Sequence, residues 1–169
     1  MAIAFDAQSK AASNGAGNRT VSHTCAAGAV LFGGAYAEDG DFCTAMSYNG
    51  TSMTFLGKKL VTGTLYVYLY FLGTPSSGAN TLQATFSSGT NGKAVMGSSY
   101  TGASTTTPTN IVSGTAAANH IDLTLTYSGG WGAGSAHVGG GGPITSVTNG
   151  VVRTSSDNPA MYDSNATES

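Results

Sequence analysis

The chain has 169 residues, of which 25 are glycine and only 8% are charged, and its formal net charge is −2. The 6 basic residues are scattered, so they cannot neutralise a run of phosphates, and nucleic-acid binding is not expected. No apolar run reaches the roughly 18 to 20 residues of a membrane helix. The N-terminus lacks a basic stretch followed by an apolar one, so we expect synthesis in the cytoplasm without a secretory signal.

Hydrophobic residues make up 40% of the chain, enough for one core, and the length suits a single domain over 1–169. Apolar residues recur at a period of two, which indicates an all-β chain. In chain order, the expected strands are 2–5, 20–25, 29–36, 45–48, 52–55, 65–72, 81–86, 93–100, 110–114, 121–127 and 145–153. Such a pattern predicts an antiparallel β-sandwich of the jelly-roll or immunoglobulin-like type, with roughly 8–10 short strands.

Asn49-Gly50 lies between the expected strands 45–48 and 52–55. This dipeptide tolerates the positive φ angles of a type I′ turn, so it predicts a tight β-hairpin.

The segment 65–72 alternates so that Tyr66, Tyr68 and Tyr70 share one face and aliphatic residues and Phe71 share the other. Because both faces are apolar, we expect a central strand with both faces covered. The tyrosine row then belongs to the core. If the row is left uncovered, it is a contact surface for a partner, since tyrosine offers a large area at a low entropic cost.

The segment 128–143 is rich in glycine and is expected to be a flexible loop, because ordering it costs more backbone entropy than usual. Trp131, the one tryptophan of the chain, lies in this segment. Three roles are open for Trp131: a lid packed on the sandwich edge, an anchor of a subunit contact, or a platform on which a sugar ring stacks.

Residues that carry catalytic or metal-binding chemistry are sparse. His23, His120 and His137 are far apart in sequence, and none has a partner at a metal-ligand spacing. The chain has no GxSxG motif at a strand-to-helix turn, so no serine triad is nominated. The sequence therefore predicts no catalytic residues, no metal site and no cofactor.

The acidic residues Glu38, Asp39 and Asp41 form one cluster. An Asp-Gly-Asp loop could offer oxygen atoms to Ca²⁺, but this one lacks the alternating ligands and distal glutamate of an EF-hand loop. We expect a solvated turn. A disulfide between Cys25 and Cys43 is feasible if their strands are adjacent, but two free thiols are the expected state in a reducing cytoplasm.

Several segments of the first hundred residues resemble a family of small β-sandwich virion proteins of tailed bacteriophages. The matching segments are AIAFDA at 2–7, VSHTC at 21–25, SYNGTSMT at 47–54 and YFLGTPSSGA at 70–79. The resemblance implies a capsid decoration protein or another accessory subunit, located on the virion surface and bound to the major capsid protein. It brings no catalytic residues.

The chain ends soon after 161–165, where the family leads us to expect a further closing strand. Either a neighbouring subunit closes that edge, or a part of the protein outside this sequence does. The first alternative predicts a homo-oligomer, because an open sheet edge accepts a strand from another chain. With so few charges, its assembly should depend weakly on salt.

The main alternative function is a carbohydrate-binding module or a host-receptor-binding sandwich domain, since fold alone does not decide between these roles. In this case, Trp131 with Tyr127, or the tyrosine row, would form the sugar platform. Asn119 or Asp122 would bond to sugar hydroxyls.

Overall fold

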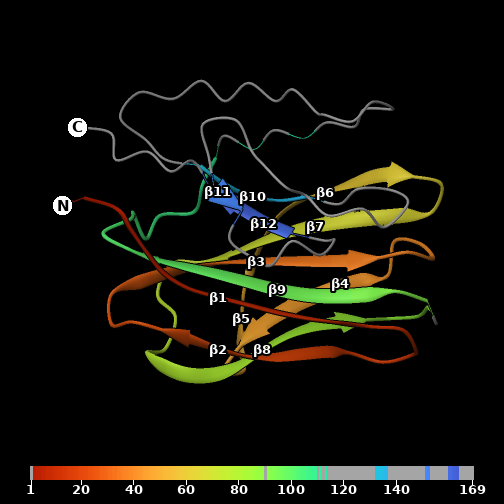
Figure 1. Ribbon diagram of the computed structural model, residues 1–169, viewed down its shortest axis with the longest axis horizontal. Coiled ribbons are helices and arrows are strands. Elements are labelled where there is room, and N and C mark those ends of the chain that lie inside the picture. The colour runs from red at the N-terminus through yellow and green to blue at the C-terminus, as the bar shows by residue number, and fades with distance from the viewer. Residues whose placement is uncertain are drawn as a thin grey trace.

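The computed structural model describes residues 2–89, 91–109, 111, 113, 132–136, 151–152 and 160–163. Within these ranges the chain forms strands and turns and no helix (Figure 1). The strands are β1 (Ala4–Ser13), β2 (Arg19–Cys25), β3 (Ala29–Ala37), β4 (Cys43–Tyr48), β5 (Thr51–Ser52), β6 (Thr54–Thr62), β7 (Leu65–Leu72), β8 (Gly78–Phe86), β9 (Lys93–Thr101), β10 (Ala133–Ala136), β11 (Val151–Val152) and β12 (Ala160–Asp163). No helix in the described ranges is long and apolar enough to cross a membrane.

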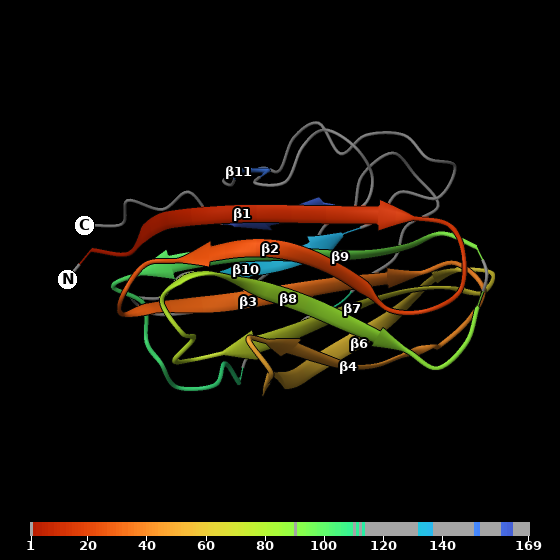
Figure 2. The ribbon, with the colours of Figure 1, turned by 90° about the horizontal axis from the view of Figure 1, so that it is seen from below.

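Two antiparallel sheets face each other. The larger has the order β1-β9-β3-β7-β6 and the smaller the order β2-β8-β4-β5. Figures 1 and 2 show the four strands of the smaller sheet lying along one face of the larger. The predicted antiparallel β-sandwich is confirmed.

The core between these two sheets is built from alternate residues of the central strands. Its largest members come from β3, β4, β7 and β8: Leu31, Met46, Tyr48, Tyr68, Tyr70, Leu82 and Phe86. Gly33 of β3 and Gly97 of β9 are register partners in the middle of this core. A Cβ on Gly33 would lie 2.2 Å from the Sδ of Met46, and one on Gly97 would lie 2.7 Å from a methyl carbon of Leu82. Glycine at both positions makes room for side chains of the smaller sheet.

A third sheet, with the order β10-β12-β11, was not expected. Strand β10 contacts β3 and β7, and β12 contacts β9. A second core lies between this sheet and the outer face of the larger sheet, and its buried residues are Val30, Phe32, Phe71, Met96, Tyr100 and Met161. The five-stranded sheet is therefore covered on both faces, which is why β3 is buried along its whole length.

The hairpin prediction is confirmed, although its second strand is short. Asn49 has a φ of 48° and Gly50 a φ of 76°, and Tyr48 pairs with Thr51 across the two-residue turn. The predicted strand 52–55 is wrong, because the chain changes sheets at Met53. The amide of Met53 donates to the carbonyl of Met46 at 2.9 Å, and β6 then joins the larger sheet beside β7.

Some of the other strands differ from the expected ranges in length or position. The range 65–72 coincides with β7, but β1 continues to Ser13, where only 2–5 was expected. The extension has no apolar alternation, and pairing with β9 forms it. The predicted loop 128–143 contains β10, so that part of the loop prediction is wrong. The predicted strands 110–114, 121–127 and 145–153 fall largely outside the described residues.

Candidate functional site

The tyrosine row of β7 lies against the smaller sheet. Tyr68 is 1% exposed and Tyr70 is 3% exposed, and both belong to the core between the two sheets. Tyr66 packs against that core and is half-buried. Tyr68 and Tyr70 are therefore core residues, which rules them out as a contact or glycan surface. The start of β4 lies over this face, because Cys43 contacts the hydroxyl groups of both Tyr68 and Tyr70.

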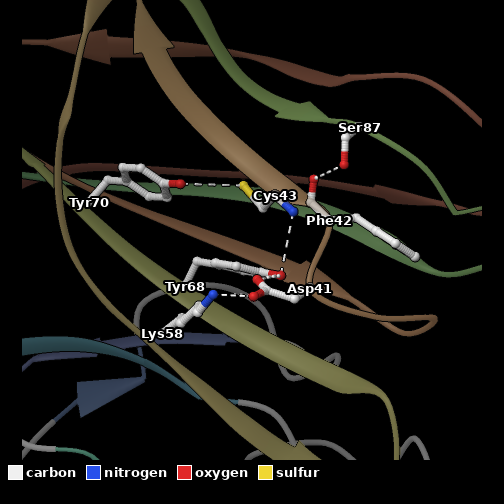
Figure 3. A network of polar contacts seen from close by, with 7 residues as sticks. All are labelled: Asp41, Phe42, Cys43, Lys58, Tyr68, Tyr70 and Ser87. Carbon is white, nitrogen blue, oxygen red and sulfur yellow. Dashed lines mark hydrogen bonds and ion pairs between the residues drawn. The ribbon is translucent and has the colours of Figure 1, made fainter.

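The hydroxyl of Tyr68 lies at the border of this core and belongs to a polar network at the start of β4 (Figure 3). Tyr68 donates to Asp41 Oδ1 at 3.0 Å, and the amide of Cys43 donates to the Tyr68 hydroxyl at 3.4 Å. Lys58 of β6 forms an ion pair with Asp41. The hydrogen bond from Lys58 holds the pKa of Asp41 below its ordinary value. The network ties β6 and β7 to the loop before β4.

Both cysteines are buried free thiols. Cys43 Sγ lies 3.7 Å from the hydroxyl oxygen of Tyr70. Burial raises the pKa of Cys43 to about 11 and also raises the pKa of Cys25. Because the thiolate is the nucleophile and the metal ligand, these thiols are poor candidates for either chemistry at neutral pH.

The acidic cluster holds the loop before β9. Glu38 accepts a hydrogen bond from the amide of Gly92 at 2.9 Å, and Asp39 accepts one from the amide of Asn91 at 2.9 Å. Glu38 also bonds to the hydroxyl of Tyr36. In the described part of the chain, no three His, Cys, Asp or Glu side chains come together as a metal site would require. The cluster is used for loop attachment.

The exposed apolar surface concentrates on β6, the strand that ends the larger sheet in the described ranges. Phe55 is 50% exposed and Leu60 is 42% exposed. Phe55 pairs with Tyr70, and Leu60 pairs with Tyr66, so both continue the tyrosine face past the rim of the smaller sheet. The rings of Phe55 and Tyr70 lie 5.3 Å apart between centroids. We call Phe55, Leu60 and the outer backbone of Thr54–Thr62 the β6 edge.

Sequence reasoning missed the β6 edge. The range 54–62 shows no alternation, because register shifts between Phe55 and Gly57 and between Leu60 and Thr62 interrupt the period of two. Gly63 could have indicated this strand. It lies in the two-residue turn just before the clearly alternating segment 65–72, and a glycine in that position suggests a hairpin with a preceding partner strand.

The other residues named from the sequence lie outside the described residues. Trp131, Tyr127, Asn119 and Asp122 belong to this group, as do His120 and His137. The structure therefore gives no position for a glycan platform built on Trp131 and Tyr127.

No family model, no curated protein and no solved structure matches this chain. The described residues define the class by themselves: an antiparallel β-sandwich whose larger sheet carries a third, small sheet on its outer face.

Proposed function

We propose that the protein is a non-enzymatic structural subunit of a virion, a capsid decoration or accessory protein that assembles with copies of itself and with other virion proteins. The observation that carries this proposal is the β6 edge, with its two exposed apolar side chains beside a sheet-terminal backbone. Such an edge suits strand pairing supported by apolar contact.

The β6 edge also carries features that restrict which partner can pair with it. Lys58 and Lys59 lie on this strand, and the two register shifts twist it. Charged residues and bulges protect an edge strand from indiscriminate pairing. Lys58 is already paired with Asp41, so a partner strand does not have to neutralise its charge.

The virion setting is supported by the resemblance of 2–7, 21–25 and 47–54 to tailed-phage sandwich proteins. Composition supports a mainly apolar and backbone-mediated contact, since 8% of the residues are charged and the net charge is −2. The described acids and thiols have structural partners or raised pKa values, which favours an assembly role over catalysis.

The test is the solution mass of the full chain, measured by light scattering at about 50 mM and about 1 M salt. We expect a dimer or larger oligomer at both concentrations, because apolar and backbone contacts are little affected by screening. The double variant Phe55→Ser with Leu60→Ser should shift the mass toward the monomer. Phe5→Ser is the matched control, since Phe5 is an exposed aromatic residue on the opposite edge strand of the same sheet.

A monomeric wild-type chain, or a double variant that keeps the oligomer, would contradict assembly through the β6 edge. A glycan array on the same sample then tests the carbohydrate-binding alternative, for which Trp131→Ala is the informative variant.

A further inference from the structure

His23 lies where the two sheets meet at one side of the sandwich. It is on β2, an edge strand of the smaller sheet, and it is 1% exposed. Its Nδ1 is 2.9 Å from the Oγ of Ser9 on β1, an edge strand of the larger sheet. A Cβ on Gly97 of β9 would lie 3.2 Å from the same nitrogen. The imidazole therefore fills a space that the glycine leaves and links β2 to β1.

The second ring nitrogen has no partner among the described residues. His23 Nε2 is buried and makes no hydrogen bond. A neutral imidazole has one N–H group, whereas the protonated ring has two. The Nδ1–H group could donate to Ser9, but a proton on Nε2 would be a buried donor without an acceptor, next to a charge that has lost its water. The structure in which β1 is paired with β9 therefore accommodates the neutral ring better than the protonated one.

The groups that face His23 offer limited compensation for a positive charge. Desolvation by burial is the larger effect on the pKa of His23 and lowers it to about 4. The negative charge of Asp6 on β1 raises this pKa by a smaller amount. Asp6 also accepts hydrogen bonds from Ala26 and Ser99. The other titratable or charged side chains on these elements that face the same core are Cys25 and Arg19 on β2, Tyr48 on β4 and Lys93 on β9. Asn80 on β8 and Ser99 on β9 are polar and uncharged.

Those neighbours do not supply an acceptor for Nε2. The ring of Tyr48 meets the imidazole edge to face, with centroids 6.1 Å apart, and its one hydroxyl proton is shared between the carbonyls of Gly78 and His23, which lie 2.8 Å and 3.0 Å from the hydroxyl oxygen. The Arg19 guanidinium is bound by backbone carbonyls of the 13–18 turn.

Strand β1 is the element that can move away from the protonated ring at the lowest cost. Within the described part of the chain, β1 pairs only with β9 and β2 pairs only with β8. Each of the ten residues of β1 is exposed or half-buried, so its release gives up little apolar burial. The pairing of β9, β3, β7 and β6 stays intact when β1 leaves.

We propose that His23 is an acid-sensitive latch on strand β1: protonation of the ring releases β1 from β9 and gives Nε2 access to water. This inference does not depend on the virion role. Release leaves the edge of β9 unpaired, which makes it a template for another strand.

The test is hydrogen–deuterium exchange of the full chain at pH 7.5 and pH 5.0, corrected for the intrinsic pH dependence of amide exchange. The pKa of His23 is about 6.5 when β1 is released and about 4 when β1 is paired with β9. The equilibrium constant for release of β1 therefore rises roughly thirtyfold between pH 7.5 and pH 5.0. We expect those amides of residues 4–13 that are hydrogen-bonded to β9 to lose protection by this factor at pH 5.0, while amides of 65–72 keep theirs. His23→Phe, which cannot be protonated, should show the same protection at both pH values, and His120→Phe is the control expected to respond like wild type.

Three results would overturn the latch: unchanged protection of 4–13 at pH 5.0, an equal loss in every strand, or a loss that persists in His23→Phe. If His23→Phe does not fold, an NMR titration of His23 in the wild-type protein decides. A midpoint near its ordinary value of 6.5 without loss of the β1–β9 contacts would contradict the proposal, and a midpoint shifted to lower pH that coincides with the loss of those contacts would support it.

Discussion

Glycine residues in this protein mark the places where backbones and side chains come unusually close. Gly73 follows β7, and a Cβ there would lie 2.1 Å from the carbonyl oxygen of Thr105. A backbone oxygen cannot rotate away as a methionine side chain can. Gly57 provides the contrast, because the nearest atom to its Cβ position is a methyl carbon of Ile111 at 3.6 Å, an ordinary contact.

At this scale we predict that Gly73→Ala lowers the free energy of unfolding by about 1–3 kcal/mol, the usual cost of forcing an extra carbon into a packed site. Urea denaturation followed by fluorescence measures the change. The matched variant Gly57→Ala should stay within about 0.5 kcal/mol of wild type. Equal stability of the two variants would show that the 103–109 segment does not pack on Gly73.

Single elements depend on local conformations as well as on pairing. The β4–β5 hairpin turns at Asn49 and Gly50, both of which have positive φ values. Asparagine and glycine tolerate this region, whereas a β-branched side chain clashes with its own backbone there. After the hairpin, Met53 takes the chain across to the larger sheet and is itself buried between the sheets.

We therefore predict that Gly50→Val destabilises the protein by about 1–2 kcal/mol, through the strain of a left-handed valine. The exchange Asn49→Gly keeps the turn type and should change stability by only a few tenths of a kcal/mol. Thermal denaturation of both variants beside wild type gives the comparison. A tolerated Gly50→Val would mean that the turn adopts another conformation.

At the scale of the whole molecule, the described residues form three layers of strands, and the third sheet packs on the larger one mainly through methionine and aromatic side chains. Met161 of β12 is fully buried and contacts the face of the larger sheet that carries Phe32, Met96 and Tyr100. The buried carboxylate of Asp163, on the same strand, accepts a hydrogen bond from Tyr100 at 2.9 Å. Figure 1 shows β10 and β12 lying near β7, on the larger sheet.

Because Met161 is fully buried between the third sheet and the larger sheet, Met161→Ala should cost about 2–5 kcal/mol, as do other truncations of buried large side chains. For a chain of this length, each kcal/mol lowers the melting temperature by about 2–4 °C. Ile111→Ala, which truncates an exposed residue outside the β6 edge, should change the melting temperature little. A Met161→Ala variant as stable as wild type would indicate a two-layered protein with a loosely attached C-terminal region.

Local features of this protein could be predicted from the sequence because their causes are local. The alternation of 65–72 and the Asn49-Gly50 pair depend on neighbouring residues, so β7 and the type I′ turn were found at their observed positions. The period of two, with strands bounded by turn-forming residues, likewise indicated an all-β sandwich. The extension of β1 had no such signal, because hydrogen bonds to β9 hold it, and β9 lies about eighty residues further along the chain.

The features on which the two proposals depend were decided by tertiary structure. Among the described residues, strand order determines which strands cover the tyrosine row, that β6 ends the larger sheet, and that His23 Nε2 has no hydrogen-bond partner. Burial is a relation between distant segments, so a pattern within one segment shows that a face is apolar but does not show what covers it.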